Sequence, residues 1–118
     1  MDRIDTLDQL SAALAEFVNE RDWDQFHNPK NLAMALAVEA GELLEHFQWL
    51  SETEAEALSP PQRQEVAMEM ADVLMFLLRL ADRLQVDLIE SAGEKLKLNR
   101  QKYPVEKARG NARKYTEL

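Results

Sequence analysis

The sequence contains no cysteine, and its longest uninterrupted apolar run covers only residues 32–38. Without cysteine there is no disulfide framework, and nothing suggests secretion. Residues 1–5 do not combine a basic region with an apolar stretch, so no signal peptide is predicted. An apolar run this short cannot cross a bilayer, which needs roughly 20 apolar residues. We therefore expect a soluble, cytoplasmic protein without a membrane partner.

Basic residues are scarce over most of the chain. Residues 1–94 hold 6 basic and 20 acidic side chains, whereas residues 95–118 hold 8 basic and 2 acidic ones, for a net charge of -8. Because the acidic surface repels a phosphate backbone, we expect no nucleic-acid partner. The basic end is either a solvated helix end or a segment that contacts acidic surface or an anionic ligand beside a metal site.

The alternating apolar pattern of β-strands is absent as well, and the sequence predicts an all-α fold. With 118 residues the chain is a single domain that would bury more apolar surface as an oligomer. Each expected helix begins with a recognisable cap. The four expected helices run from Thr6 to about Arg21, from Asn28-Pro29 to about Leu50, from Ser59-Pro60 to about Leu84, and from Asp87 to just before Pro104.

The second and third of these helices are the most apolar, which predicts that they form the antiparallel core pair of a four-helix bundle. The acidic segment 51–58 connects them and is expected to hold a short helical turn. We expect one helical domain over residues 1–104 and a basic, mobile C-terminal tail over residues 105–118.

Two carboxylate pairs, Glu39 with Glu42 and Glu69 with Asp72, lie inside the two most apolar stretches. No lysine or arginine occurs between residues 31 and 49 or between residues 64 and 78, so local ion pairs cannot neutralise these acids. Burying an uncompensated carboxylate costs several kcal/mol. Residues three apart on a helix are neighbours, and two such pairs on antiparallel helices can face each other. Four oxygen donors in this arrangement suit Mg²⁺ or Mn²⁺.

These acids allow two other interpretations. They could all point to solvent and simply solubilise the bundle, but Gly41 argues against this. Glycine costs about 1 kcal/mol relative to alanine inside a helix, and it more often marks a close approach of two backbones. A di-iron bundle would need Glu-x-x-His motifs. The residue three before His46 is Leu43, so that motif is absent.

Several motifs together resemble those of the MazG-like all-α nucleoside triphosphate pyrophosphohydrolases, and within them the dCTP pyrophosphatase branch. The resemblance runs nearly from end to end. The residues that carry it are Glu20-Arg21-Asp22-Trp23 with Gln25-Phe26-His27, Glu39-Ala40-Gly41-Glu42-Leu43 with Phe47-Gln48-Trp49, Glu69 to Val73, Asn99 with Tyr103-Pro104, and Arg113 to Leu118.

The resemblance implies hydrolysis of a (deoxy)nucleoside triphosphate, dCTP or a modified dCTP, to the monophosphate and pyrophosphate. It implies that Glu39, Glu42, Glu69 and Asp72 are the catalytic metal ligands, with Mg²⁺ as cofactor and Mn²⁺ as a substitute. The family further implies a homotetramer built from dimers. The residues expected to bind substrate are His27, Trp23 and Trp49 around the base, and Lys95, Asn99 and Tyr103 at the phosphates or sugar.

Two positions depart from the expected pattern. Phe76 stands where the dCTP-type pattern has tyrosine, and Leu50 stands where it has lysine. Tolerance for several deoxynucleotides is therefore expected. Two further functions stay open at this point: a non-catalytic helical module that binds metal or a partner, and a phosphoribosyl-ATP pyrophosphohydrolase. Phe26 is expected in the core, and each tryptophan could be a core residue as well.

Overall fold

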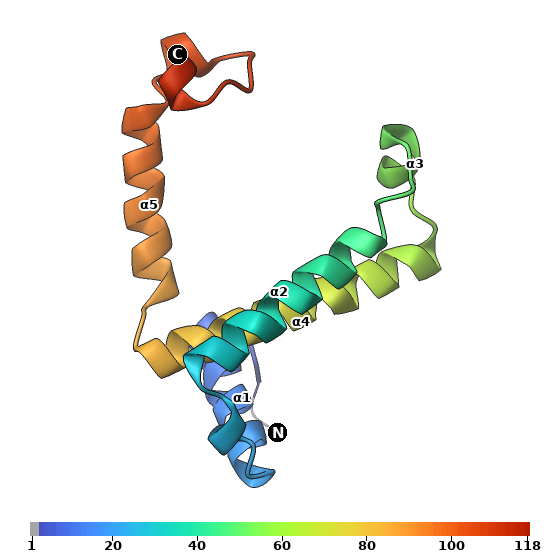
Figure 1. Ribbon diagram of the computed structural model, residues 1–118, viewed down its shortest axis with the longest axis vertical. Helices are drawn as coiled ribbons and strands as arrows, with labels where there is room; N and C mark the ends of the chain where they lie inside the picture. The colour runs from blue at the N-terminus through green and yellow to red at the C-terminus, as the bar shows by residue number, and fades with distance from the viewer. Residues whose placement is uncertain (1–2) are drawn as a thin grey trace. The chain divides into compact units, whose positions relative to one another are not determined.

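The computed structural model describes residues 3–118, and within this range it contains helices and no strand. The all-α fold class is therefore confirmed (Figure 1). None of the helices over the described residues has both the length and the apolar character that a membrane span requires. In chain order the elements are α1 (Leu7–Glu20), η1 (Asp24–Phe26), α2 (Pro29–Glu45), α3 (Glu52–Glu56), α4 (Pro60–Leu84), α5 (Leu88–Lys102), α6 (Val105–Ala108) and η2 (Tyr115–Glu117).

The predicted helix starts are confirmed by their capping hydrogen bonds. Thr6 and Ser59 each exchange side-chain and backbone hydrogen bonds with a glutamine three residues later, which satisfies donors that the first helical turn leaves free. Asn28 and Asp87 accept the corresponding backbone N–H groups at the starts of α2 and α5. Sequence alone is thus sufficient to locate where these four helices begin.

The end of α2 differs from the prediction. The helix ends at Glu45 rather than near Leu50, because the next two backbone N–H groups donate hydrogen bonds to carbonyl groups only three residues earlier. The N–H of His46 donates to Leu43 and that of Phe47 donates to Leu44. Such tight turns commonly finish a helix. Trp49 consequently lies outside α2, just before the short helix α3.

The chain divides into two compact units, one ending at Gln85 and one covering Val86–Leu118. Gln85 closes α4 in a left-handed backbone conformation, with φ of 56°. The boundary predicted after residue 104 falls inside the second unit, where Pro104 is the N-cap of α6. The division into residues 1–104 and a tail stays a prediction.

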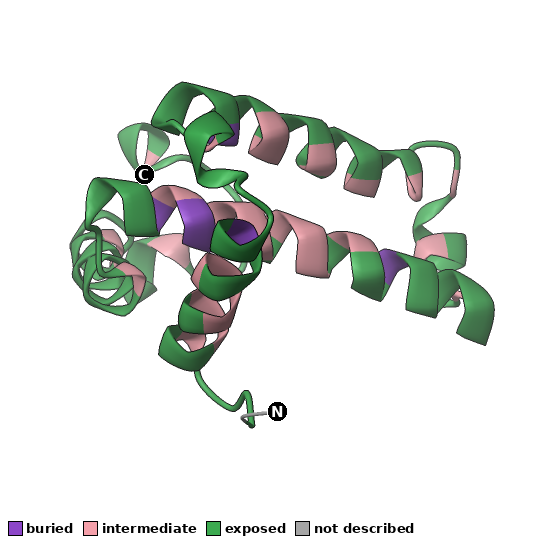
Figure 2. Ribbon diagram, turned by 90° about the horizontal axis from the view of Figure 1, so that it is seen from below, coloured by how far each residue is buried: buried purple, intermediate pink, exposed green. Residues whose placement is uncertain are grey.

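In the first unit α4 packs against both α2 and α1. The helices α2 and α4 lie side by side and run in opposite directions, as predicted (Figure 1). Most buried residues gather where the three helices meet (Figure 2). Leu32, with 1% of its surface exposed, is the most deeply buried of them. The buried apolar residues are Val18, Leu32, Val66, Leu78 and Ala81, and the buried charged residue is Arg79.

The expected close approach at Gly41 is absent from the described residues. A Cβ atom built on Gly41 would meet no atom within 4 Å. The core pair also leaves large apolar side chains exposed at helical spacing, with Met34 and Val38 on α2 and Met70 and Leu74 on α4. These four residues, here called the apolar strip, are between 36% and 59% exposed.

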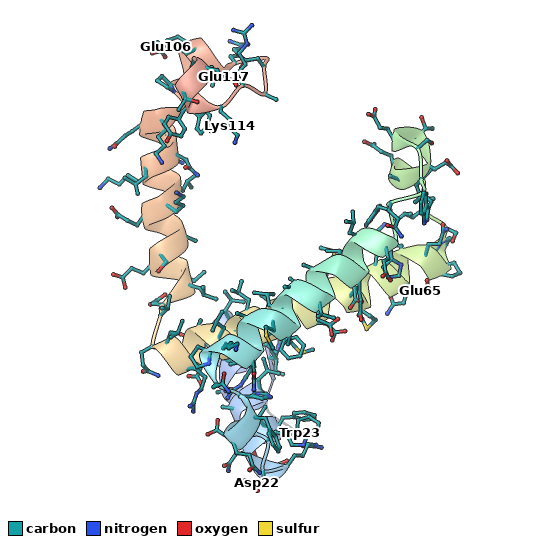
Figure 3. The ribbon with its side chains drawn as sticks, in the orientation of Figure 1. Asp22, Trp23, Glu65, Glu106, Lys114 and Glu117 are labelled. Carbon is teal, nitrogen blue, oxygen red and sulfur yellow. The ribbon has the colours of Figure 1, made fainter. Side chains whose placement is uncertain are left out.

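The second unit consists of α5, α6 and η2. The ring of Tyr103, at the end of α5, meets the ring of Tyr115 edge to face, with centroids 6.1 Å apart. The ammonium group of Lys102 lies 4.8 Å from the centroid of the Tyr115 ring, a cation–π contact. The segment after residue 104 contains two short helices, α6 and η2, that were not predicted from the sequence. Figure 3 labels Glu106, Lys114 and Glu117 in this segment.

Candidate functional site

The two predicted carboxylate pairs come together between α2 and α4. One carboxylate oxygen from each of Glu39, Glu69 and Asp72 lies within 4.8 Å of the other two. Glu42 is exposed at the edge of this group, and its carboxyl interacts with those of Glu39 and Glu69. We call Glu39, Glu42, Glu69 and Asp72 the acid cluster. It forms because three-residue spacing puts each pair on one helix face and antiparallel packing turns the two faces toward each other.

The acids of this cluster perturb one another strongly. Hydrogen bonding with Glu42, shielding from water and the nearby Glu39 carboxyl raise the pKa of Glu69 to about 8. Shielding from water is also the main reason that the pKa of Glu39 is raised. Carboxylates this close cannot all ionise cheaply, so at least one holds a proton near neutral pH unless a cation is bound.

The chemistry of the cluster fits a divalent cation. The Oε2 atom of Glu39 is shielded from solvent and has no hydrogen-bond partner among the described residues. The ion pairs of residues 3–118 all involve other acids, so no arginine or lysine neutralises the cluster. A buried oxygen without a donor is costly, whereas oxygen ligands are what Mg²⁺ and Mn²⁺ prefer.

The chain after α1 turns sharply and places Trp23 beside that helix (Figure 3). Asp22 adopts a left-handed conformation with φ of 55°, and the N–H of Trp23 donates back to the carbonyl of Val18 at 3.0 Å. A residue of this kind commonly ends a helix. The turn brings the Trp23 ring onto Phe17, with centroids 5.7 Å apart and planes at 75°. Edge-to-face contact of this kind holds an aromatic ring in a defined orientation.

An apolar cavity of about 170 Å³ opens between α1, this turn and α4. A cavity of about 150 Å³ can hold a benzene ring, so this one has room for a single pyrimidine ring. Its wall includes one member of the acid cluster, Asp72. We call it the aromatic cavity, and it is lined by Leu14, Phe17, Val18, Trp23, His27, Asp72, Met75, Phe76 and Arg79.

A second, more open hollow of about 350 Å³ lies on α4 and at the end of α2. It is lined by His46, Gln64, Glu65, Met68, Glu69 and Asp72. Because Asp72 lines both hollows, they adjoin the acid cluster, and the larger one also carries the carboxylates of Glu65 and Glu69. A ligand with an aromatic ring at one end and charged groups at the other matches this arrangement.

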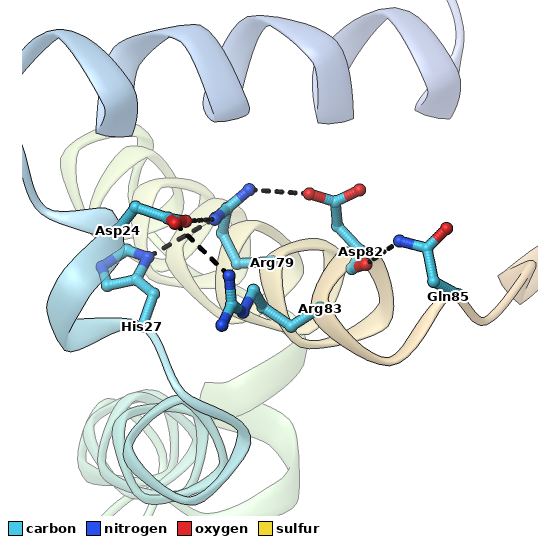
Figure 4. A network of polar contacts seen from close by, with 6 residues as sticks. All are labelled: Asp24, His27, Arg79, Asp82, Arg83 and Gln85. Carbon is cyan, nitrogen blue, oxygen red and sulfur yellow. Dashed lines mark hydrogen bonds and ion pairs between the residues drawn. The ribbon is translucent and has the colours of Figure 1, made fainter.

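Arg79 is the centre of a polar network beside the aromatic cavity (Figure 4). Its guanidinium group donates to Asp82 at 3.0 Å, to Asp24 at 3.3 Å and to Nδ1 of His27 at 3.5 Å. Arg83 donates to the other oxygen of Asp24 at 3.3 Å. Burial and then the Arg79 charge lower the pKa of His27, although Asp24 opposes them. The imidazole of His27 is therefore neutral at physiological pH.

A model of the MazG-like family matches residues 34–118, more than half of the chain. The chain belongs to the MazG-like family. The mouse (Mus musculus) protein dCTP pyrophosphatase 1 is 49% identical over 115 residues, which cover 96% of this chain and 68% of that protein. The human (Homo sapiens) protein of the same name is 46% identical with the same coverage. The family resemblance found in the sequence is thus confirmed.

The fold of this MazG-like chain is also that of a solved relative. A crystal structure of a pyrophosphatase from Archaeoglobus fulgidus matches it with a TM-score of 0.80 and 38% sequence identity. The match covers 88% of this chain and 97% of that one. The similarity in structure therefore extends over most of the chain and confirms the MazG-like all-α fold.

Not all predicted site residues of this MazG-like chain meet in one place. Trp23 and His27 line the aromatic cavity, but Trp49 does not, and 87% of its surface is exposed. Phe26, expected in the core, lies in the short helix η1 and is 58% exposed, so that expectation is wrong. Lys95 and Asn99 belong to α5 in the second unit and Tyr103 is its C-cap, with Lys95 exposed and Asn99 half-buried. The role of each in binding stays a prediction.

Two features of the site in this family member were not predicted from its sequence. The contribution of Leu14 and Phe17 to the cavity could not be foreseen, because it depends on how α1 packs against α4. The buried Arg79 did leave a signal, since it is the one basic residue in the apolar stretch of residues 71–81. A charge in such a stretch is rarely buried without partners, so acids near it in space could have been sought.

Proposed function

We propose that this protein is a nucleoside triphosphate pyrophosphohydrolase. Its substrate is a (deoxy)nucleoside triphosphate, dCTP or a modified dCTP, and its products are the monophosphate and pyrophosphate. Support comes from two mammalian relatives named dCTP pyrophosphatase 1 and from a structural relative named a pyrophosphatase. One observation carries the proposal. Three carboxylates converge, one of them has an oxygen without a hydrogen-bond partner, and one of them, Asp72, also lines a cavity with room for one aromatic ring.

In this proposal Glu39, Glu42, Glu69 and Asp72 hold Mg²⁺, which Mn²⁺ can replace. When bound, this cation would supply charge neutralisation for the phosphate oxygens and Lewis-acid activation of the phosphate. The carboxylates fix the position of the triphosphate relative to the cavity, and one of them accepts the proton of the attacking water. The water oxygen bonds to the α-phosphorus, the bond between that phosphorus and the bridging oxygen breaks, and pyrophosphate leaves.

The base would occupy the aromatic cavity, where it would stack on Trp23 and accept a hydrogen bond from His27. Stacking on an aromatic side chain is worth about 1–3 kcal/mol per base but discriminates weakly between bases. Phe76 lines the same cavity and offers no hydroxyl group. The preference among bases then depends on the few polar groups that line the cavity. Trp49 lies outside this cavity, and its predicted contact with the base stays a proposal.

The remaining predicted contacts involve α5 and other copies of the chain. Lys95 and Asn99 share one face of α5, Tyr103 follows at the same spacing as its C-cap, and all three would contact phosphates or sugar. We propose a homotetramer that buries the apolar strip, since monomers rarely leave such residues exposed together. No nucleic acid or membrane takes part, and the cytoplasm is the proposed location.

Identification of the products tests the proposal. The purified protein is incubated with Mg²⁺ and, in separate samples, with each common nucleoside and deoxynucleoside triphosphate and with phosphoribosyl-ATP, and the products are resolved by ³¹P NMR. Monophosphate and pyrophosphate in equal amounts support the proposal. Diphosphate with orthophosphate would contradict it, and so would the absence of any turnover, which a non-catalytic module predicts. Turnover of phosphoribosyl-ATP alone would favour the other pyrophosphohydrolase.

A further inference from the structure

The contact between Arg79 and His27 determines which nitrogen of the imidazole carries the proton. The Nε atom of Arg79 faces Nδ1 of His27 at 3.5 Å. An arginine stays protonated at all physiological pH values, and its nitrogens only donate hydrogen bonds. The Nδ1 atom must therefore offer its lone pair to Arg79, and the proton of the neutral ring lies on Nε2.

Arg79 is held firmly enough to impose this choice. Its side chain is only 5% exposed, and two carboxylates from different parts of the chain fix its guanidinium group, Asp82 on α4 at 3.0 Å and Asp24 on η1 at 3.3 Å. Asp24 is itself held by Arg83 at 3.3 Å (Figure 4). A buried guanidinium with two such partners cannot rotate away from His27 without leaving a charge unpaired.

His27 is the polar group through which the apolar wall of the cavity can discriminate between ligands. Leucine, phenylalanine, valine, tryptophan and methionine side chains make up most of that wall, and Asp72 belongs to the acid cluster. The guanidinium of Arg79 is already engaged with its acidic partners. A ring nitrogen that only donates accepts a partner with a lone pair and rejects one with an N–H group, because the two donors would oppose each other.

We propose that Arg79 is a positioning residue that fixes His27 as a hydrogen-bond donor facing ring position 3 of the base, so that the aromatic cavity selects bases with an acceptor at that position. The inference rests on the proposed function for its substrate class. Among pyrimidines, cytosine presents an unprotonated N3, whereas uracil carries a proton on N3. Arg79 thereby sets the preference for cytosine over uracil through the orientation of His27, because its own guanidinium group is engaged with Asp24 and Asp82.

The first test needs no substrate. The chain has two histidines, so a His46→Gln variant leaves His27 as the only imidazole in ¹⁵N NMR spectra. In this variant, above the pKa of His27, we expect the signal of an unprotonated nitrogen for Nδ1 and that of a protonated one for Nε2. An Arg79→Met change in the same background keeps much of the buried volume and removes the donor, and we expect a mixture of the two tautomers. Equal tautomer populations before that change would overturn the inference.

The second test measures selection between bases with the otherwise unchanged enzyme. The ratio of kcat/KM for dCTP to that for dUTP is expected to fall about tenfold in Arg79→Met, through KM rather than kcat. Arg83→Met is the matched control, because Arg83 also binds Asp24 but does not line the aromatic cavity. It should keep both the tautomer and the ratio.

The two tests distinguish failure of this inference from failure of the proposed function. If the enzyme hydrolyses triphosphates and Arg79→Met leaves the ratio unchanged, Arg79 does not set specificity. An equal fall of the ratio in Arg83→Met would also contradict the inference, since loss of either arginine of the polar network would then have the same effect on specificity. If no triphosphate is hydrolysed at all, the proposed function fails, and the tautomer measurement still decides whether Arg79 orients His27.

Discussion

Carboxylate oxygens of Glu39 on α2 and Glu69 on α4 lie within 4.8 Å of each other, although the two residues belong to different helices. Each alone would be an ordinary acid on a partly apolar helix. Together with Glu42 and Asp72 they become a site in which protons and divalent cations compete for the same oxygens. The pH dependence of stability and the binding of divalent cations both depend on that competition.

Without divalent cations, the stability of the folded protein should fall as the pH rises. The pKa of Glu69 is raised from 4.5 to about 8, so between these values the folded protein binds more protons than the unfolded chain. Its free energy of unfolding then decreases with increasing pH. Melting temperatures in EDTA from pH 5 to pH 8 measure this slope. Glu69→Gln should flatten it, whereas Glu45→Gln, at an exposed position of α2, should not. An unchanged slope in Glu69→Gln would contradict the coupling.

Mg²⁺ or Mn²⁺ should raise the melting temperature, and more so at pH 8 than at pH 6. Binding to the folded state alone stabilises it by mass action, and the ligands must lose their protons to bind. Glu39→Gln removes the unpartnered Oε2 ligand and should weaken Mn²⁺ binding at least tenfold in calorimetry. Glu45→Gln again serves as the control. Equal Mn²⁺ binding by the two variants would exclude the cluster as the site.

Removing the indole of Trp23 should raise KM and change kcat little. Loss of stacking worth about 1–3 kcal/mol corresponds to a roughly 5- to 150-fold weaker interaction with the base. Steady-state kinetics of Trp23→Ala measure this change. Phe26→Ala is the control, because Phe26 is a nearby aromatic residue that is 58% exposed and does not line the cavity. Similar kinetics in both variants would show that the base binds elsewhere.

Truncation of Leu32 should destabilise the first unit. This side chain is 1% exposed at the contact of α2 with α4, and Leu→Ala changes at such sites cost about 2–5 kcal/mol. Urea unfolding of Leu32→Ala gives the loss directly. Leu44→Ala makes the same chemical change on the same helix at a position that is 61% exposed, and it should cost far less. Equal losses would place the core elsewhere.

The sequence was sufficient to predict the helices, because their starts depend on local hydrogen bonds. Thr6, Asn28, Ser59 and Asp87 each cap the first turn of their own helix, and no distant residue is needed. Helix ends were harder to predict. The end of α2 depends on turns at His46 and Phe47, and no glycine or proline in the sequence indicates these turns.

The acid cluster could be predicted and the aromatic cavity only in part, for the same physical reason. Three-residue spacing determines a helix face, so the pairing of Glu39 with Glu42 and of Glu69 with Asp72 followed from the sequence. The walls of the cavity depend on how α1 packs against α4, which local patterns do not encode. The prediction that Phe26 lies in the core rests on its hydrophobicity alone, and it is wrong, since 58% of the residue is exposed.

The most direct test of the central claim is pyrophosphate release from dCTP across a Mg²⁺ titration, with wild-type protein and Glu39→Gln side by side. Circular dichroism first establishes that both are folded. The account predicts release that requires Mg²⁺ in the wild type and falls at least 100-fold in Glu39→Gln at every Mg²⁺ concentration. Release by the wild type in excess EDTA, or equal rates for the two proteins, would contradict it.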